Sequence, residues 1–513
     1  MTRKCIIGLA AAIIVSGLGL SACAGQGKPR TGDPLTDILN PDLRVSERIR
    51  STQRALRDAE AGRADAEETR RVLKVVAWAR AAPVELRLAV IEGLFAERGK
   101  EDDSRALARY LLPHEKNERV VRYLAEVAVA RGWVDVTPSL VRCYAQRGFG
   151  EQDDARPEHQ ALLALHPGAR IDQIVFEIFL DPGIEDGSSG TGGTTGNSSV
   201  DWTALTRADA WDLLARLDAD GTLRAELLFS DRFDALTGTG AILRADLKAC
   251  VEQLHTIPLS AAELTWLGRL RHPQDAGDAQ WWTEAAQAVG RVSKNNLSGL
   301  RLRHIEPIRW AAAHRPEWLV ADRDELMSTF RSRLDGRRFN RRSARERESG
   351  VLFQERLAQR HAELRWADLI ALLVIDEALS SGAVRAALFE QAAMDQADRT
   401  TEYGGVLASD ADAPERFDVM LFPPRPASRL GDDRFVASAD LIRSSDAALA
   451  HYHFHVQRWS NARFAGPSRH DLVYAWRQGR SCLVLSGIRR GVLGVDYYQP
   501  DGVIVDLGEI RAP

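Results

Sequence analysis

Cysteine is scarce in this sequence, with five in 513 residues, and no two of them form a CxxC pair. Cys143, Cys250 and Cys482 are widely spaced, so their pattern predicts no disulfide framework. The sequence also has no Walker loop, no G-x-G-x-x-G and no G-x-S-x-G motif. These absences count against nucleotide binding and against a serine hydrolase built on a nucleophile elbow.

Neither sign of charge predominates, because 68 Lys and Arg stand against 72 Asp and Glu. A balanced chain has no global field that attracts polyanions, so we expect no nucleic-acid partner. The most basic segment, 331–347, holds eight arginines. It fits either a phosphate- or headgroup-binding face or a solvated helix, and the absence of an interleaved aromatic platform favours the solvated helix.

The N-terminus has the features of a targeting segment. Arg3 and Lys4 precede an apolar run, Ile6–Leu20, that is too short to span a membrane comfortably. The motif Leu20-Ser21-Ala22-Cys23 follows and resembles the lipobox of bacterial lipoproteins, in which the cysteine becomes acylated. The resemblance implies export and a lipid anchor on Cys23 in the cell envelope, on the periplasmic side of an outer membrane where one is present. An ordinary secretory signal or an uncleaved anchor is the alternative.

Composition changes along the chain and divides it into segments. The run GIEDGSSGTGGTTGNSS is low-complexity and predicts a flexible linker or long surface loop. We predict a signal peptide (1–22), a polar tether (23–40), a helical region (41–182), the linker (183–199), a mostly helical middle region (200–380) and an α+β domain (381–513). The fold class is therefore multidomain, with all-α N-terminal and middle regions and a mixed C-terminal domain.

Apolar residues recur at spacings of three and four through the helical region. This periodicity predicts helices at 67–82, 83–98, 104–112, 118–131 and 138–146. The segment Val84–Val90 has a loose echo in Val120–Ala125, and repeated helix pairs of this kind resemble HEAT-type repeats. An unrelated helical bundle fits the pattern equally well. With either arrangement, we expect the helices to form a scaffold or a substrate-presenting surface.

From about residue 400, short apolar runs bounded by Gly and Pro replace the helical periodicity. They predict strands at 402–408, 418–422, 447–456, 482–486, 492–498 and 503–507. One helix is predicted before the first strand, at 383–397, and another after the third, at 471–478. Asp501-Gly502 predicts a tight turn between the last two strands.

Three histidines alternate with aromatic residues in the segment Ala450-His451-Tyr452-His453-Phe454-His455-Val456. On a strand, residues i and i+2 point to the same face about 6.6 Å apart, so an adjacent pair can converge on one Zn²⁺. The outer pair, about 13 Å apart, cannot do so easily. His453 belongs to both adjacent pairs and is therefore the safest ligand.

Two further motifs accompany the histidines. Glu402-Tyr403-Gly404-Gly405-Val406-Leu407 lies upstream, and Gly466-Pro467-Ser468-Arg469-His470-Asp471-Leu472 lies downstream at the start of a predicted helix. A glutamate on a strand, then His-x-His, then Ser-x-x-Asp-Leu on a helix resembles the JAMM (JAB1/MPN) metallopeptidase pattern. The order of the predicted elements also matches that family.

The resemblance implies a zinc site and a role for each residue. Three residues match the metal ligands: His453, His455 and Asp471, with His451 as the alternative histidine. Glu402 matches the general base, and Ser468 matches the residue that stabilises the oxyanion. The interval from His455 to Ser468 is thirteen residues, longer than is usual in the family, so we expect 457–465 to form a loop.

Each of these residues also has a simpler explanation. Ser468 and Asp471 form an S-x-x-D capping box, which needs no metal. Glu402 fits a solvent-facing strand residue, and His470 fits the exposed first turn of a helix. Only the order of the motifs within one domain favours a joint metal site.

The whole sequence is interpreted as an exported, lipid-anchored protein whose helices present a JAMM-like zinc peptidase or isopeptidase domain. We expect membrane lipid, through Cys23, and a protein or peptide as partners. Two alternatives remain open. One is an envelope scaffold or binding lipoprotein with an inactive JAMM-like domain, and the other is a helical-repeat lipoprotein with an unrelated β-domain. The sequence does not indicate the substrate.

Overall fold

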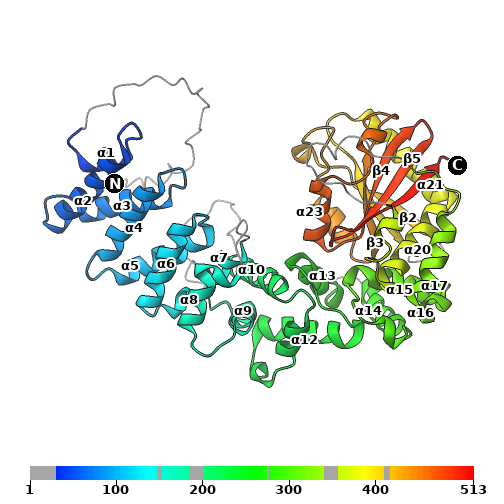
Figure 1. Cartoon of the computed structure of the whole chain (residues 1–513), viewed down its shortest axis with the longest axis horizontal. Helices are drawn as coiled ribbons and strands as arrows, with labels where there is room; N and C mark the ends of the chain where they lie inside the picture. Colours follow the sequence, from blue (N-terminus) through cyan, green and yellow to red (C-terminus); the bar gives the residue numbers. More distant parts are fainter. Residues whose placement is uncertain (1–30, 147–152, 184–200, 274–275, 340–355, 410–415) are drawn as a thin grey trace, which may run out of the picture. The chain divides into compact units, whose positions relative to one another are not determined.

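The computed structural model describes residues 31–146, 153–183, 201–273, 276–339, 356–409 and 416–513 (Figure 1). The predicted signal peptide with Cys23, nearly all of the Gly/Ser/Thr segment and Arg341 to Arg347 lie outside these residues. The chain separates into two compact units, residues 1–124 and 125–513. In the described part, no helix combines the length and the apolar character that crossing a membrane requires.

The first unit is helical, as its periodicity predicts. Its helices are α1 (Pro34–Leu39), α2 (Val45–Glu60), α3 (Ala66–Trp78), α4 (Val84–Ala96), α5 (Glu101–Leu111) and the start of α6 (Glu118–Ala130). Asp65 caps α3 by accepting from the backbone N–H groups of Glu67 and Glu68. Helix α1 lies inside the segment predicted as a tether, and Ile38 in it is buried.

The second unit begins with helices that run to residue 380. They are α7 (Thr137–Ala145), α8 (Pro157–Leu165), α9 (Ile171–Leu180), α10 (Trp202–Leu217), α11 (Thr222–Leu228), α12 (Gly238–Leu254), α13 (Ala261–Arg271), α14 (Ala276–Val289), α15 (Leu302–His314), α16 (Pro316–Val320), α17 (Arg323–Leu334), α19 (Leu357–Arg360) and α20 (Trp366–Ser380). The predicted all-α character of the N-terminal and middle regions is confirmed.

The C-terminal part is a six-stranded mixed sheet in the order β2-β1-β3-β4-β5-β6. The strands are β1 (Gly404–Ser409), β2 (Phe417–Leu421), β3 (Ala448–His455), β4 (Cys482–Arg489), β5 (Val492–Tyr498) and β6 (Ile504–Arg511), with helices α21 (Gly382–Ala397), α22 (Ala439–Ser444) and α23 (Arg469–Gln478). Among the named strands of the described residues, β3 and β4 form the one parallel pair, and α23 makes the crossover between them. The predicted α+β layout is therefore confirmed.

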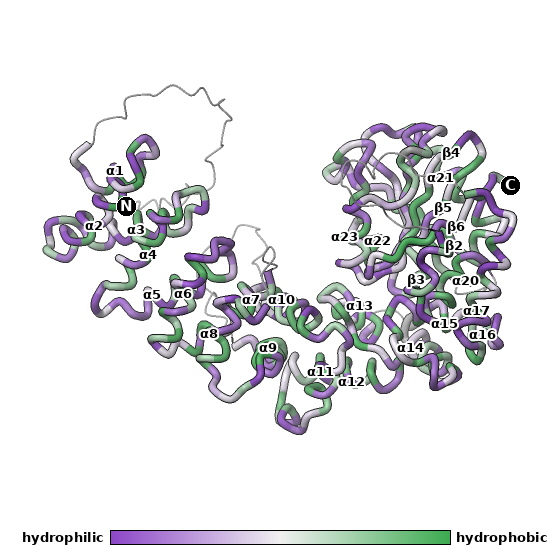
Figure 2. Tube along the Cα trace, in the orientation of Figure 1, coloured by the Kyte–Doolittle hydropathy of each residue, from purple (hydrophilic) through white to green (hydrophobic). Residues whose placement is uncertain are grey.

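Helices cover both faces of this sheet (Figure 1). Ala475 of α23 packs on one face against Cys482, Val484 and Tyr498. Helices α15 and α20 contact β3. Every residue of α20 except Glu377 and Ser380 is buried, and most of α20 is hydrophobic in Figure 2. Helix α20 precedes the boundary expected at 381 and nevertheless belongs to the core beneath the sheet.

Strand β3 lies at the centre of the site. All of its residues are buried, which a strand covered on both faces requires. The hydroxyl of Tyr452 contacts Gln391 of α21, whereas His451 Nδ1 lies 2.7 Å from the hydroxyl of Tyr474 on α23. Because side chains alternate along a strand, His453 and His455 point to the same face as His451, toward α23.

Candidate metal centre

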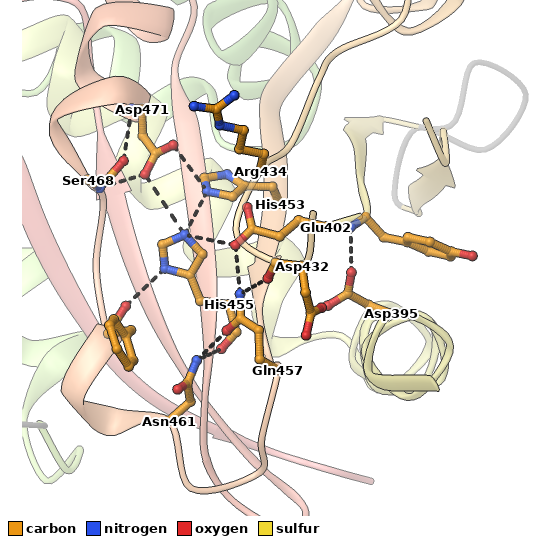
Figure 3. Close-up of polar contacts among 12 residues, drawn as sticks. Asp395, Glu402, Asp432, Arg434, His453, His455, Gln457, Asn461, Ser468 and Asp471 are labelled. Carbon is orange, nitrogen blue, oxygen red and sulfur yellow. Dashed lines mark hydrogen bonds and ion pairs between the residues drawn. The ribbon is translucent and has the colours of Figure 1, made fainter. Parts of the chain in front are cut away.

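Four of the residues singled out in the sequence converge at one point (Figure 3). His453 and His455 extend from β3, Asp471 lies in the first turn of α23, and Glu402 lies just before β1. Glu402, His453 and His455 are all buried, and one ligand atom from each lies within 4.8 Å of the others. This buried Glu/His/His cluster could hold a metal ion.

Asp471 completes the cluster from the helix side. His453 Nε2 lies 3.2 Å from His455 Nε2 and 3.5 Å from Asp471 Oδ1. His455 Nε2 lies 3.9 Å from Asp471 Oδ2 and 3.8 Å from Glu402 Oε1. Two imidazoles and two carboxylates thus surround one point, and their negative charge suits a divalent cation.

Two of these four separations are close to those of a metal coordination shell, and the two at His455 Nε2 to a carboxylate oxygen, 3.8 and 3.9 Å, are longer. A tetrahedral ion with ligand atoms about 2.0–2.1 Å away holds neighbouring ligand atoms about 3.3 Å apart. The His453–His455 and His453–Asp471 separations of 3.2 and 3.5 Å are close to that edge length. The donor set of imidazole and carboxylate is also one that zinc accepts, so the residues fit such an ion.

The backbone fixes the ring orientation of His455. Its Nδ1 lies 2.9 Å from the carbonyl oxygen of Phe464 and therefore donates a proton to it. The lone pair of a neutral ring is then on Nε2, which points into the cluster. Asn461 supports the strand here, since its Nδ2 donates to the His455 carbonyl oxygen at 3.0 Å.

His453 is held by aromatic neighbours. The ring of Phe435 stacks on it with centroids 5.8 Å apart, and the hydroxyl of Tyr498 lies 3.5 Å from His453 Nδ1. Burial by itself lowers the pKa of His453, but the negative charges of Asp471 and Glu402 outweigh burial and raise it. A cation and a proton compete for the same ring nitrogen, so a bound cation would lower that pKa again.

The capping box at the start of α23 orients Asp471. The backbone N–H of Ser468 donates to Asp471 Oδ2 at 2.5 Å, and Ser468 Oγ accepts from the backbone N–H of Asp471 at 3.3 Å. Burial would raise the pKa of Asp471, but His453 and His455 hold it well below its usual range. The capping box and the metal site are therefore not alternatives, because the box presents the carboxylate to the histidines. His470, by contrast, is exposed.

The sequence pattern placed Glu402 on a strand, and that prediction is wrong. The strand starts at Gly404, and the backbone N–H of Glu402 donates instead to the carbonyl oxygen of Arg434 at 3.3 Å. Its side chain is not solvent-facing either, because Glu402 is only 4% exposed. Gln457 Nε2 donates to Glu402 Oε1 at 2.8 Å and fixes that oxygen beside the histidines.

A buried carboxyl group lies behind Glu402. Asp395 on α21 accepts from the backbone N–H of Tyr403, and burial, with the charges of Glu402 and Asp432, raises the pKa of Asp395 to about 8. At neutral pH this carboxyl group is therefore mostly protonated. Its neutral form limits the negative charge that accumulates around the cluster.

His451 lies beside the cluster rather than in it. It lines a cavity of about 70 Å³ together with Phe435, His453, Asp471, Tyr474 and others. In the described part of the chain, no partner reaches His451 Nε2, although the residue is only 2% exposed. His451 Nε2 is therefore an unsatisfied polar atom in a residue that lines the cavity beside His453 and Asp471.

Several supporting residues were not identified from the sequence. Gln457, Asn461 and the carbonyl of Phe464 all come from the long interval between His455 and Ser468. Apart from the short 3-10 helix Ala462–Phe464, this interval is a loop, as expected. Its unusual length was the only signal available, since none of these residues belongs to a motif.

Comparison with protein-family models, with curated proteins and with solved structures finds no match to this chain. The interpretation of the site therefore rests on its geometry and on the sequence motifs.

Proposed function

We propose that the C-terminal domain is a zinc-dependent amide hydrolase, a peptidase or isopeptidase of JAMM-like design, in a lipid-anchored envelope protein. The observation that carries the proposal is the buried convergence of Glu402, His453 and His455, with Asp471 beside them. Catalytic zinc is held by three protein ligands with a further position open for water or substrate, and four converging side chains supply three ligands and one base.

We assign Asp471 rather than Glu402 as the third ligand. The carboxylate of Asp471 approaches both histidines, at 3.5 and 3.9 Å, and lies in the first turn of a helix that orients it. Glu402 Oε1 approaches His455 at 3.8 Å and is already engaged by Gln457. A carboxylate at the edge of the coordination shell suits proton transfer better than ligation.

Zinc bound in this cluster would polarise a water molecule and lower its pKa to about 7. The carboxylate of Glu402 would serve as the base that takes a proton from water and as the acid that returns it to the leaving amine, so one group would fill both roles. Ser468 provides a hydroxyl for the developing oxyanion. Because its pKa is raised, Asp395 is mostly neutral and adds no second negative charge beside Glu402.

The cavity beside His453 limits the substrate. A water molecule needs about 10–15 Å³ of such space, so a cavity of about 70 Å³ accepts a group of only a few heavy atoms. His451 Nε2 offers this group one hydrogen bond. We therefore expect a small polar side chain next to the bond that is cleaved.

The two carboxylates give a matched pair of variants. Glu402→Gln should retain the metal and lose hydrolysis of fluorogenic peptide and isopeptide substrates, because a base is not a ligand. Asp471→Asn should lose both metal and hydrolysis. Metal lost from Glu402→Gln but retained by Asp471→Asn would reverse the two roles. A metal-bound wild type that cleaves none of these substrates would favour the non-catalytic binding module.

The envelope location rests on the motif that ends at Cys23. Metabolic labelling with an alkyne fatty acid should label the wild type but not Cys23→Ser, because acylation needs the cysteine. Equal labelling of the two proteins would exclude Cys23 as the anchor.

A further inference from the structure

A second cavity, built from segments other than those of the metal centre, has four arginines among its nine lining residues. Its volume is about 350 Å³. The residues around it come from the segment after α17, from the α20–α21 junction and from the end of β6: Gly336, Arg337, Arg338, Leu379, Ser380, Arg385, Glu509, Ile510 and Arg511. Four of these side chains are cationic and one is anionic.

The charges of the lining residues do not cancel locally. Arg337 is paired with the buried carboxylate of Asp376 at 2.7 Å, and Glu509 is paired with Arg489 at 3.0 Å. Within the described ranges, no carboxylate pairs with the remaining three arginines: Arg338, Arg385 and Arg511. The Nε atom of Arg385 is buried and has no hydrogen-bond partner there. Three arginines that have no carboxylate partner among the described residues therefore line one concave surface.

The backbone around this cavity is held in place. The N–H of Glu509 donates to the carbonyl oxygen of Arg338 at 2.9 Å, and Arg337 Nη1 donates to the carbonyl oxygen of Leu507 at 3.1 Å. Gly508 permits this close approach, because a Cβ on it would lie 3.0 Å from the Arg338 carbonyl oxygen. Its φ of 84° also suits glycine. The segment with Arg338 is thus fixed on the free edge of β6.

We infer that this cavity binds a phosphorylated ligand through Arg338, Arg385 and Arg511. The planar fork of arginine matches phosphate oxygens bidentately, and a phosphate group carries up to two charges and three acceptor oxygens. Leu379 and Ile510 add an apolar wall for the organic part of a phosphate ester. The arginine-rich segment, interpreted from the sequence as a solvated face, therefore contributes Arg338 to a binding site.

The inference is tested by calorimetric titration of the full chain with pyrophosphate at low ionic strength. Arg385→Gln and Arg511→Gln should each raise the dissociation constant about tenfold, since each removes a charge-assisted hydrogen bond. Arg331→Gln is the matched control, because Arg331 is an exposed arginine of α17 outside the cavity. Repeating the titration in a His453→Ala background separates this binding from chelation of a metal.

The source of the phosphate is distinguished by a second probe, dihexanoyl phosphatidic acid below its micellar concentration. Tighter binding of this lipid than of pyrophosphate, dependent on Arg385, would indicate a lipid headgroup. Binding of pyrophosphate alone would indicate a soluble phosphate compound, and both results support the site. Equal affinities in wild type, Arg385→Gln and Arg511→Gln, or no binding of either probe, would overturn it.

Discussion

At the scale of single residues, the metal centre depends on which atoms point inward. Alternation along a strand predicted that two adjacent histidines share a face, but it could not choose between His451 and His455. The choice depends on neighbours far along the chain: Tyr474 engages His451, and the Phe464 carbonyl engages His455. The sequence therefore indicated the residue types of the candidate cluster, and tertiary contacts assigned their positions.

Asn461 should affect the metal although it does not touch it. Its amide supports the His455 carbonyl at 3.0 Å and Gln457 Oε1 at 2.6 Å. Supporting residues of this kind typically change metal affinity about 10–100-fold, so Asn461→Ala should weaken metal binding at least about tenfold in a chelator competition assay. Asn296→Ala is the control, because Asn296 likewise donates to a backbone carbonyl, that of Ala321, on the helical side. Unchanged affinity in folded Asn461→Ala would show that the loop does not position the ligands.

His304 should make the stability of the protein depend on pH. Its Nδ1 accepts from the Arg301 N–H, and its Nε2 donates to Asp368, which also pairs with Arg303. Burial, followed by the charge of Arg303, lowers the pKa of His304 to about 4, from about 6.5 in an unfolded chain. Between these values the unfolded chain binds a proton that the folded chain does not, so acidification favours unfolding.

Protonation of His304 in the unfolded chain should lower the free energy of unfolding by about 3 kcal/mol between pH 6.5 and pH 4. Chemical denaturation of wild type and His304→Gln across this range measures it, and the difference between the two free energies of unfolding should shrink as the pH falls. A constant difference would mean that His304 does not titrate as its burial requires.

At the scale of elements, the sequence predicted the bounds of a helix best where its apolar residues recur at helical spacing throughout. Helices α4 and α6 lie within two residues of their predicted bounds, because apolar spacing and flanking Pro or Gly mark their ends. The pattern failed at Glu402, whose backbone bonds to the loop at Arg434 instead of joining the strand. Such a bond joins two segments with no periodicity, so no local signal could predict it.

Strand β1 tolerates no side chain at Gly405. A Cβ there would lie 2.0 Å from the Met420 carbonyl oxygen and 2.4 Å from the Tyr452 hydroxyl. Overpacking of this kind costs about 1–3 kcal/mol or more, so Gly405→Ala should lower the melting temperature and disturb the adjacent Glu402. Gly382→Ala is the control, since nothing lies within 4 Å of a Cβ at that position. Equal melting temperatures of the two variants would contradict the close packing of β1 between its neighbours.

At the scale of the whole molecule, composition and periodicity were sufficient for the fold class but not for the extent of the C-terminal core. Helix α20 is mostly apolar, and all of its residues except Glu377 and Ser380 are buried, but its sequence does not show what covers it. The structure places it and α15 against β3, and Ser409 at the end of β1 donates to Glu306 of α15 at 2.6 Å. The middle helices and the sheet therefore share a core.

This shared core predicts how fragments behave. Residues 381–513 alone should not show a cooperative thermal transition, because removal of α15 and α20 exposes the apolar face beneath β3. Residues 131–513, which begin after α6, should fold and unfold cooperatively by circular dichroism. If residues 381–513 alone melted cooperatively and bound metal, the sheet and helices α21 to α23 would suffice to form a stable domain.

In the proposed metal centre, His453, His455 and Asp471 hold a single divalent ion, and Glu402 lies beside it as the base. Elemental analysis of the purified full chain by mass spectrometry tests this arrangement most directly, with His453→Ala as the comparison and His272→Ala as the control, because His272 is an exposed histidine after α13. We expect about one zinc per chain in the wild type and in His272→Ala, and none in His453→Ala. A folded wild type without a stoichiometric metal, or a His453→Ala variant that retains it, would contradict the account.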